Sequence, residues 1–437
     1  MALKSPFSKL FELIVLKTHR EVLSTTDLQF GYKKGLSTYS CTFVADEVIQ
    51  HYMNGRNDVH VMLLDASKAF DCVNYITLFK TLLAKGLCPL ICRVLLFMHV
   101  AQVVQVRWGS QLSDSFAVSN GVKQGGILSP VLFSIYTDTM LCALRDTGVG
   151  CYLGHLFAGA LAYADDVVLL APTKSALSRM LSVAGDCADM LSLRFNGTKS
   201  QYVRFCSGHR ASEGDSIDFC GVKVPLSEEG LHLGNLLGVG SRENAIRKAV
   251  LDLQCRSNVL LSRFSFCFPD VRYKLFKAYC VIAYGSQLWD FDSRSVNDYF
   301  ACWRRCVRRV WGLPNMTHCR FLPAICLDRD IKSQLLSRSL NFVRTAASSK
   351  NSLLNSCCAV ALRGSASAVS NTICRLANDF CLTREWIGFS SEPLPCDTTH
   401  VTSPEAAVIR DFAIAHHAAS GEDKNFMHEI IYQLCTI

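Results

Sequence analysis

Two adjacent aspartates with an apolar run on each side are the first candidates for chemistry in this sequence. Asp165 and Asp166 lie within residues 159–171, where the pattern predicts two short strands joined by a tight turn that carries the charged pair. Burying such carboxylates without a counter-charge is costly, and a divalent cation would supply one. Mg²⁺ prefers oxygen ligands of this kind. The alternative is an ordinary Asp-Asp turn exposed to solvent.

A third carboxylate follows another apolar run, about a hundred residues earlier. Residues 59–65 alternate and then become continuously apolar, which predicts a buried strand with Asp65 at the point where the strand emerges. A metal site built from these groups requires that the two strand ends meet. The sequence therefore predicts a sheet that brings Asp65 beside the aspartate pair.

A glycine-rich segment, residues 120–130, lies between the two acidic segments. Its glycines allow the backbone to approach a ligand closely. Ser129 as an N-cap followed by Pro130 predicts that a helix begins here. A helix N-terminus favours negative charge, and a phosphate is the expected ligand. The apolar spacing that follows predicts a buried helix face whatever the function.

The order of these segments resembles the palm of reverse transcriptases. Residues 64–71 (Leu-Asp-Ala-Ser-Lys-Ala-Phe-Asp), 121–130 (Gly-Val-Lys-Gln-Gly-Gly-Ile-Leu-Ser-Pro) and 163–166 (Tyr-Ala-Asp-Asp) are similar to motifs of the polymerase of non-LTR (LINE-like) retrotransposons. The resemblance implies an α+β fold, a right-hand polymerase palm whose antiparallel sheet is backed by helices. It also implies partial fingers before the palm and a mainly helical thumb-like and C-terminal region after it.

The resemblance assigns the chemistry to a small set of residues. Asp65, Asp165 and Asp166 would be catalytic and would bind metal, and the backbone carbonyl of Ala66 would add a ligand. The cofactor would be Mg²⁺ as two ions, with Mn²⁺ as an alternative. Lys199, in a turn before the expected strand 201–205, would help the pyrophosphate to leave as proton donor or point charge. A solvated turn lysine is the alternative for that position.

A second set would contact the nucleotide, namely Lys33, Lys34, Phe70, Gln124 and Gly125. Phe70 would exclude a 2′-hydroxyl by its volume, although a plain core residue is the alternative. Gln124 resembles the glutamine that touches the nucleotide and the templating base. Lys33 and Lys34 lie in a basic turn that resembles a fingers motif, and at least one of them is expected to be a solvated loop lysine.

A third set would contact nucleic acid. Residues 231–234 resemble the primer-grip hairpin that ends the palm, which makes Leu233 and Gly234 candidates. Residues 295–311 are expected to form a helix with four arginines, Arg304, Arg305, Arg308 and Arg309. Members of this set lie one turn apart, so their mutual repulsion would be relieved by a phosphate backbone. A solvated helix face is the alternative.

Composition limits the remaining classes of function. The chain has 437 residues, half of them apolar, and a formal net charge of +8, which suits a polyanionic partner. Its 22 cysteines include no Cys-x-x-Cys pair, so we expect reduced thiols, and the residual zinc candidate is Cys302, Cys306 and His318 or Cys319. The apolar stretches contain charges and predict no membrane span. No compact nuclear localisation signal is seen.

The predicted organisation has four parts. Residues 1–58 would be partial fingers, 59–240 the palm with fingers insertions, 241–345 a helical thumb-like region, and 346–437 a C-terminal helical region of unknown role. Helices are expected at 42–52, 76–100, 174–193, 251–264, 273–289 and 295–311, and a hairpin at 102–118. The family normally has more fingers sequence upstream, and many members also have an endonuclease. The resemblance therefore implies a truncated element or an internal start codon.

The predicted function is RNA-directed DNA synthesis, with an RNA template, a DNA primer and dNTPs as partners and no clear protein partner. A catalytically inactive nucleic-acid-binding remnant is the main alternative. A nucleotidyl cyclase-type palm would not explain Gln124, Phe70 or the basic helix, and an RNA polymerase is disfavoured by Phe70. We expect an intracellular protein that works in the nucleus if it is functional.

Overall fold

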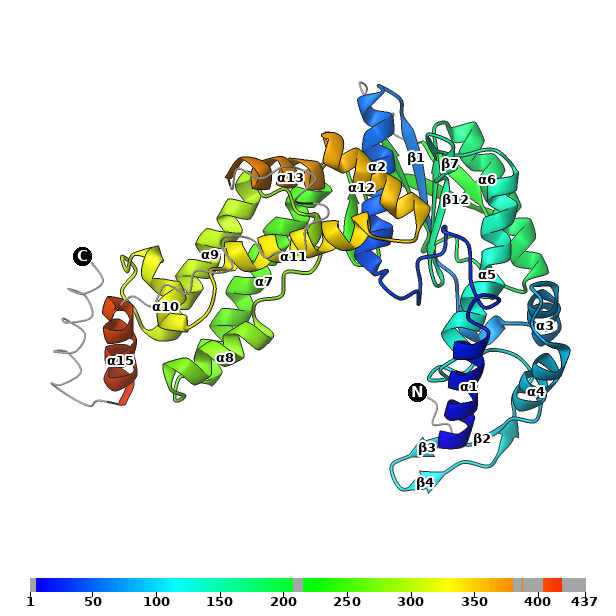
Figure 1. Cartoon of the computed structure of the whole chain (residues 1–437), viewed down its shortest axis with the longest axis horizontal. Coiled ribbons are helices and arrows are strands. Elements are labelled where there is room, and N and C mark those ends of the chain that lie inside the picture. Colours follow the sequence, from blue (N-terminus) through cyan, green and yellow to red (C-terminus); the bar gives the residue numbers. More distant parts are fainter. Residues whose placement is uncertain (1–4, 207–214, 380–386, 388–403, 419–437) are drawn as a thin grey trace. The chain divides into compact units, whose positions relative to one another are not determined.

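The computed structural model describes residues 5–206, 215–379, 387 and 404–418. The chain divides into two compact units. The first comprises Met1–Val239 with Ser349–Cys357, and the second comprises Gly240–Ser348 with Cys358–Ile437. Figure 1 shows that the first unit surrounds a β-sheet and that the second is built from helices. Each unit is described by itself, and most of the expected C-terminal region beyond residue 379 lies outside the described residues.

A six-stranded sheet forms the centre of the first unit. Its strands, in spatial order, are β11 (Ser216–Phe219), β12 (Val222–Ser227), β10 (Gln201–Phe205), β1 (Val59–Leu64), β9 (Asp166–Ala171) and β8 (Ala160–Tyr163). All neighbouring pairs are antiparallel except β10 and β12, which pair in parallel. The expected antiparallel palm sheet is therefore present with one parallel exception.

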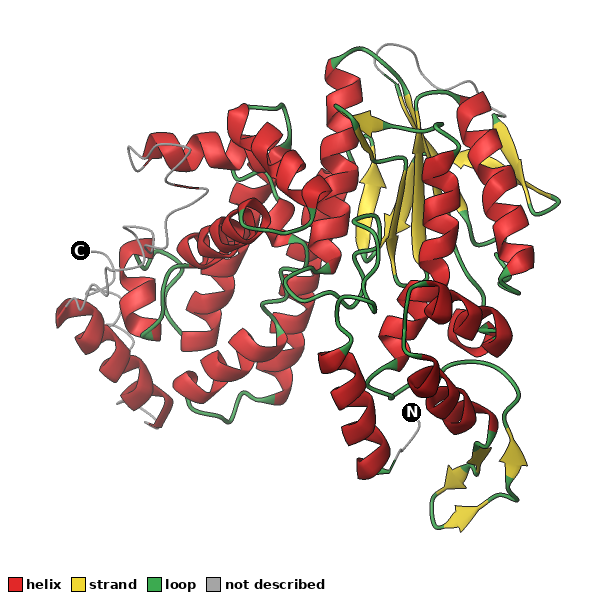
Figure 2. Cartoon of the chain, turned by 45° about the vertical axis from the view of Figure 1, so that its right-hand side comes forward, coloured by secondary structure: helices red, strands yellow, loops and turns green. Residues whose placement is uncertain are grey.

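Helices cover both faces of this sheet, as Figures 1 and 2 show. Helix α2 lies on one side, and α5 and α6 lie on the other. Burial on both sides explains why β1 is apolar except for His60, whose ring bonds the Tyr202 hydroxyl: all six of its residues are buried. The helices of this unit are α1 (Pro6–Thr18), α2 (Thr38–Asn54), α3 (Tyr75–Ala84), α4 (Pro89–Val100), α5 (Ser129–Asp146) and α6 (Lys174–Met190).

The described part of the first unit also contains four pairs of short antiparallel strands. They are β2 (Val103–Val104) with β5 (Phe116–Ala117), β3 (Arg107–Trp108) with β4 (Gln111–Leu112), β6 (Tyr152–Leu153) with β7 (Leu156–Phe157), and β13 (Glu229–His232) with β14 (Asn235–Gly238). The first two together form the hairpin expected at residues 102–118, and Gly109, with φ of +60°, makes its tip. The last is the hairpin expected around residues 231–234.

The second unit is helical in its described residues. Its helices are α7 (Ser241–Arg263), α8 (Pro269–Tyr279), α9 (Arg294–Trp311), α10 (Leu322–Cys326), α11 (Ile331–Ala347), α13 (Ala368–Asp379) and α15 (Pro404–Ala418), and α12 (Ser352–Arg363) crosses the division. The Ser293 side chain caps the start of α9, and Gly312, with φ of +69°, ends it. Its buried face includes Tyr299 and Trp303, which pack against the rest of the unit.

The expected helix at residues 273–289 is wrong in its second half. Helix α8 ends at Tyr279, and the chain then turns through Gly285, with φ of +75°, into a 3-10 turn at Ser286–Leu288. Helix α7 extends further towards the N-terminus than expected because Gly240 precedes a polar first turn that periodicity does not reveal. Across the described residues, no helix combines the length and apolar character that a membrane crossing requires.

One buried histidine lies in the β13–β14 hairpin. The His232 side chain is 3% exposed, and neither ring nitrogen has a hydrogen-bond partner in the structure. Burial disfavours the charged imidazolium and lowers the pKa of His232 to about 4. The unfolded chain, with an ordinary histidine pKa of 6.5, therefore binds a proton more readily than the folded chain between these two values.

This difference predicts that acid destabilises the fold below pH 6.5. The loss continues until about pH 4, where the folded state also takes up the proton, and it amounts to about 3 kcal/mol from this group. His232→Leu should flatten the stability profile over that window, as measured by urea unfolding at a series of pH values. The exposed His155 provides the matched control, because His155→Leu should leave the slope unchanged. A His232→Leu profile parallel to that of the wild type would contradict the prediction.

Candidate active site

The pairing of β1 with β9 brings the distant acidic segments together. The register sets Leu64 opposite Val167, so the next position along places Asp65 beside Asp166. Asp65 follows the last residue of β1, as predicted, and its side chain is half-buried. An antiparallel ladder with its register fixed by buried residues leaves the two aspartates no other arrangement. The convergence predicted from the sequence is thus present in the backbone.

The second acidic segment forms a tight hairpin. Strands β8 and β9 are closed by the pair Tyr163 and Asp166, so Ala164 and Asp165 make the turn. The tip is therefore one residue earlier than predicted, because Asp166 already belongs to β9. Ala164 has φ of +60°, the left-handed region that residues other than glycine rarely adopt. Something outside the turn must hold it in this conformation.

The three carboxylates repel one another. Partial burial, followed by the charge of Asp65, raises the pKa of Asp165. Partial burial, followed by the charges of Asp165 and Asp65, raises the pKa of Asp166. The charge of Asp65 therefore disfavours the ionised forms of Asp165 and Asp166, and the charge of Asp165 disfavours that of Asp166. This mutual repulsion, in a set of oxygen donors alone, fits a site for a divalent cation of the magnesium type.

The three side chains do not yet form a complete coordination shell. Within the described residues, no three acidic, histidine or cysteine side chains converge as closely as a metal ion requires. The charges of Asp65 and Asp165 nevertheless act on the carboxylates of the hairpin. The donor set therefore fits the cation in its chemistry and in its backbone placement.

The turn after α6 fixes Asp65 from the other side. The backbone N–H of Asn196 donates to the Asp65 carbonyl at 2.8 Å, and the Asp65 N–H donates to Ser200 Oγ at 3.3 Å. Ala66 forms an isolated antiparallel bridge with Phe195, but the hydrogen bonds of that bridge use the Asp65 carbonyl and the Ser67 N–H. The Ala66 carbonyl lies outside these bonds, as its predicted role as a ligand requires.

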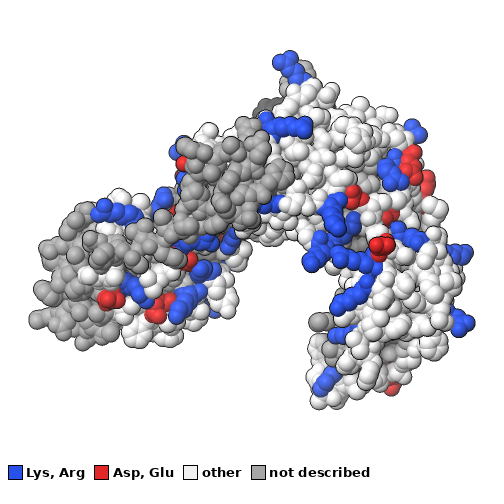
Figure 3. Space-filling model, viewed as in Figure 1, with Lys and Arg blue, Asp and Glu red and all other residues white. Residues whose placement is uncertain are grey.

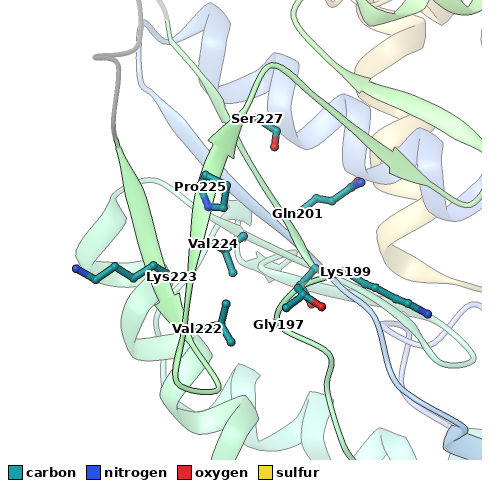
Figure 4. A pocket seen from close by; sticks show the side chains of 10 residues that line it. Gly197, Lys199, Gln201, Val222, Lys223, Val224, Pro225 and Ser227 are labelled. Atoms are coloured by element: carbon teal, nitrogen blue, oxygen red, sulfur yellow. The ribbon is translucent and has the colours of Figure 1, made fainter.

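Lys199 lies in the same turn and is exposed. The turn is therefore anchored to Asp65 by these hydrogen bonds, and Lys199 lies within it. A shallow hollow adjoins it between the turn and β12. In Figure 4 the side chains of Lys199 and Lys223 extend away from each other on opposite sides of this hollow. The hollow thus has no convergent charges, and the position of Lys199 relative to Asp65 is the feature relevant to chemistry.

The glycine-rich segment packs against the end of the first motif. Gly121 has φ of +86°, and a Cβ there would meet the backbone of Asp71 at 2.9 Å. The Val122 N–H donates to the Phe70 carbonyl at 2.8 Å. Gln124 is exposed beyond this contact and is followed by Gly125, with φ of +113°. The predicted nucleotide contacts Gln124 and Gly125 are therefore held over the motif that contains Asp65.

Phe70 is partly a core residue and partly a surface residue. Its ring stacks on the buried Phe133 with centroids 4.3 Å apart and planes at 13°. The side chain is nevertheless only half-buried, so part of the ring remains on the surface. It sits in a 3-10 turn, Ala69–Cys72, five residues beyond Asp65. A rigid aromatic ring with part of its edge exposed is what exclusion by volume requires.

The expected helix N-terminus is not available to a phosphate. Helix α5 begins at Ser129, so Leu128 and not Ser129 is the N-cap, and the Ser129 side chain makes no capping bond. The buried carboxylate of Glu12 accepts hydrogen bonds from the N–H groups of Ile127 at 2.8 Å and Leu128 at 3.3 Å. A side chain from α1 already supplies the negative charge that this helix end favours. The prediction of an anion site there was wrong because Glu12 occupies this helix end. The sequence did not reveal the contact because Glu12 is 115 residues away.

Gln29 is a site residue that the sequence analysis missed. Its side chain has 0% exposure, and its Oε1 accepts hydrogen bonds from the N–H groups of Ala164 at 3.0 Å and Gly31 at 2.9 Å. It therefore contacts the turn that carries Asp165. The only local signal is its place in the basic turn that resembles a fingers motif, and that pattern says nothing about its distant partner.

Comparison with known proteins identifies the family of this constellation. A family model described as reverse transcriptase (RNA-dependent DNA polymerase) matches residues 3–224, slightly more than half of the chain. The chain belongs to the reverse transcriptase family. The prediction made from the three motifs is confirmed, and the α+β sheet with its helices is the polymerase palm.

Curated relatives are Pol polyproteins of R2 retrotransposable elements. The chain is 31% identical over 162 residues to the polyprotein of the type-2 element R2DM from Drosophila melanogaster, an alignment covering 36% of this chain and 15% of that protein. It is 26% identical over 240 residues to the polyprotein of a type-1 element R2 from Popillia japonica, covering 54% and 32%. The chain therefore aligns with less than a third of the length of these reverse transcriptase relatives.

Solved structures similar to the chain include telomerases. One is telomerase from Candida tropicalis in complex with a fragment of telomeric RNA, at 12% identity and a TM-score of 0.38, covering 99% of this chain and 57% of that one. Another is telomerase from Candida albicans in complex with a fragment of telomeric RNA, at 13% identity and a TM-score of 0.36, covering 81% and 58%.

The two candidate fingers lysines of this reverse transcriptase differ from each other. Lys33 is partly buried, and its ammonium group donates to the carbonyls of Thr25 and Thr26. Burial lowers the pKa of Lys33, and the negative charges of Asp27 and Asp138 raise it by a smaller amount. Lys34 is exposed. Lys33 thus stabilises the loop, and Lys34 is the one of the pair that solvent and ligands reach.

The predicted nucleic-acid contacts also divide into two kinds. In the hairpin β13–β14, the tip consists of Leu233 and the exposed Gly234. On α9, both guanidinium donors of Arg308 bind the Thr317 carbonyl at 2.7 and 2.9 Å, and Arg309 donates to Asn258 at 2.8 Å. The remaining two arginines of the set, Arg304 and Arg305, are half-buried and exposed respectively.

The zinc candidate does not assemble. Cys302 and Cys306 are buried on one face of α9 and interact with each other, which lowers the pKa of Cys306 to about 7. His318 instead uses its ring nitrogen to cap a 3-10 turn by accepting from the Arg320 N–H, and Cys319 is exposed. In the part of the chain that the structure describes, these groups form no cluster of three.

The mutual repulsion of the carboxylates predicts that a substitution at this site can stabilise the fold while it removes a group needed for the proposed chemistry. In buffer with a chelator at pH 7, Asp166→Asn should raise the thermal midpoint, because a neutral amide removes a like-charge contact worth about 1 kcal/mol or less. Asp146→Asn at the end of α5 is the matched control, since it removes a favourable pair with Arg145 and should not stabilise. Differential scanning fluorimetry gives both midpoints, and an unchanged or lower midpoint for Asp166→Asn would contradict the prediction.

Proposed function

We propose that the chain catalyses RNA-directed DNA synthesis on a primer held by an RNA template, as the reverse transcriptase of an R2-like non-LTR element. The observation that supports this most is the backbone register that brings Asp65 beside the Asp165–Asp166 turn. Family membership supplies the class of reaction, and the arrangement of the three carboxylates supplies its centre. Because the chain aligns with only part of its curated relatives, the activity is assigned to this segment as a proposal.

In the proposed mechanism Asp65 and Asp165, assisted by Asp166 and the Ala66 carbonyl, would hold two Mg²⁺ ions. When bound, such ions lower the pKa of the primer 3′-hydroxyl and neutralise charge on the triphosphate and on the pyrophosphate that leaves. The protein residues would hold the primer 3′-hydroxyl in line with the triphosphate and would exclude other arrangements of these two groups. A bound cation would offset the repulsion from Asp65 that contributes to the raised pKa values of Asp165 and Asp166.

The surrounding residues would set the substrate. Phe70 would select deoxynucleotides by closing the space that a 2′-hydroxyl needs, because its ring is fixed on Phe133. Gln124 and Gly125 would contact the nucleotide, with Lys34 nearby in the fingers turn. Lys199 would serve the leaving pyrophosphate from the turn that is bonded to Asp65. Sequence information would come from base pairing between template and primer.

Positive charge suits the proposed nucleic-acid partners. The net charge of the whole chain is +8, and Figure 3 shows Lys and Arg side chains gathered along one side of the first unit near its N-terminal segment. Such a surface attracts a phosphate backbone without reading its sequence. The tip of the β13–β14 hairpin would hold the primer, and Arg304 and Arg305 would add contacts. Insertion into chromosomal DNA would place this work in the nucleus.

Primer extension tests the proposal directly. With poly-rA as template, oligo-dT as primer and Mg²⁺, the chain should incorporate dTTP, and Asp165→Asn should lower the rate at least about a hundredfold through loss of a charged ligand. The control Asp146→Asn should retain the wild-type rate. Incorporation absent from wild-type protein that still binds an RNA–DNA duplex in a gel-shift assay would favour the alternative, a catalytically inactive nucleic-acid-binding remnant.

Sugar selection gives a second test. Phe70→Ala should open the space above the sugar and reduce the preference for dNTP over rNTP by about tenfold to a hundredfold, the range that steric fit in a pocket supplies. Phe70→Tyr is the matched control, because it keeps the ring on Phe133 and should retain the preference. The measurement is the ratio of kcat/KM for dTTP and UTP. Equal ratios for the alanine and wild-type proteins would remove Phe70 from this role.

A further inference from the structure

We propose that Gln29 is a positioning residue for the proposed polymerase reaction and that it fixes the turn that carries Asp165. The inference rests on the proposed function for the identity of the reaction, but its geometric basis is independent of it. The starting point is Ala164, the residue between Tyr163 and Asp165. Its φ of +60° is unfavourable for alanine by about 1–2 kcal/mol, so the turn needs support from its surroundings.

Gln29 supplies that support by binding both backbone groups of Ala164. Its Oε1 accepts from the Ala164 N–H at 3.0 Å, and its Nε2 lies 3.4 Å from the Ala164 carbonyl oxygen and donates to it. The N–H and C=O of Ala164 belong to the two peptide units on either side of its Cα, so one rigid amide that binds both restrains the φ and ψ angles of Ala164. The conformation of the residue before Asp165 is therefore set by a side chain more than a hundred residues away in sequence.

The orientation of the Gln29 amide is itself fixed. Oε1 also accepts from the Gly31 N–H at 2.9 Å, and Nε2 also reaches Thr137 Oγ1 at 3.4 Å. With the amide reversed, its NH₂ group would face two N–H donors, which the hydrogen-bond pattern does not permit. The side chain has 0% exposure, so water cannot replace these partners. The hydrogen bonds that join Gln29 to Ala164, which we call the clamp, are thus a fixed part of the fold.

The backbone around Gln29 is pressed against the same hairpin. Gln29 forms a parallel bridge with Ala162, with the Phe30 N–H donating to the Ala162 carbonyl at 2.7 Å and the Ala162 N–H donating to the Leu28 carbonyl at 2.9 Å. A Cβ added to Gly31 would meet the Ala164 nitrogen at 2.6 Å. The segment therefore lies directly along β8 and the turn, with no room for a larger residue between them.

Residues 25–33, which we call the strap, are anchored on α5 at the other end. The buried carboxylate of Asp138 accepts from the Thr26 N–H at 3.0 Å and from its hydroxyl at 2.6 Å. Lys33 closes the loop by donating to the Thr25 and Thr26 carbonyls. The strap thus connects a rigid helix to the metal-binding turn, and Gln29 is the group that makes the final contact. Loss of that contact should let Asp165 move while the rest of the palm stays folded.

Gln29→Met tests the inference, because methionine has nearly the same length and cannot form these hydrogen bonds. Hydrogen exchange of the peptide that contains Ala164 should become about tenfold faster, and Mn²⁺ affinity measured by electron paramagnetic resonance should fall by about tenfold, the scale for a group that orients metal ligands. In primer extension kcat should fall, with KM for the template-primer changed by less than about twofold.

Controls separate positioning from general destabilisation. Thr372→Val in the second unit removes a buried hydroxyl that also bonds two backbone groups, at 3.0 and 3.2 Å, and should change neither exchange at Ala164 nor Mn²⁺ affinity. Thr137→Val is the milder variant of the clamp, with smaller changes expected in the same direction. It keeps the test decisive should Gln29→Met fail to fold.

Unchanged exchange at Ala164 in both clamp variants would overturn the inference, and so would faster exchange with wild-type Mn²⁺ affinity. Failure of the proposed function looks different. In that case the wild-type protein does not incorporate dTTP, while the differences in exchange and Mn²⁺ binding between the wild type and Gln29→Met persist.

Discussion

Like charges held together by strand pairing are the constraint on which the first unit depends. The ladder between β1 and β9 sets Asp65 beside the Asp165–Asp166 turn, and the buried residues of both strands prevent any slip in register. The fold keeps these carboxylates close although the charge of Asp65 disfavours the ionisation of Asp165 and Asp166. Apolar burial in the sheet offsets this repulsion.

Buried polar side chains near the N-terminus then hold the backbone around the carboxylates. Gln29 binds the turn before Asp165, and Glu12 occupies the start of α5. Asp138 returns the contact from α5 to the strap. Each of these groups is almost fully buried and accepts from backbone donors, and such hydrogen bonds add rigidity while they offset the desolvation penalty. The N-terminal segment is therefore part of the site.

Features that depend on local periodicity could be predicted from the sequence. Strand β10 was predicted at its observed bounds, β1 was predicted to end just before Asp65, and α9 begins within one residue of its expected start. The backbone placement of Asp65 beside Asp166 could be predicted because apolar runs ending in carboxylates leave few places for them in a sheet. Family resemblance, confirmed by the match to residues 3–224, supplied the rest of the palm.

Features that depend on distant partners could not be predicted. Nothing around Gln29 reveals Ala164, and nothing around Ser129 reveals that Glu12 takes the place of a bound phosphate. The end of α8 at Tyr279 lies inside an apolar run, where propensity does not distinguish helix from a compact turn. The roles of Arg308 and Lys33 in binding carbonyls were also invisible, because charge patterns do not show which cations have internal acceptors.

Residues 349–357 belong to the first unit although they follow residues 240–348 of the second. This order affects when the first unit can finish folding during synthesis. Asp27 accepts hydrogen bonds from the Ser352 N–H and hydroxyl, and the Asn351 side chain donates to the Asp27 carbonyl at 2.8 Å. These partners are separated by more than 320 residues. A ribosome must therefore translate more than 320 further residues before Asp27 acquires these contacts. Nascent chains interrupted before that point would leave Asp27 solvated, and the strap that contains it open to chaperones and proteases.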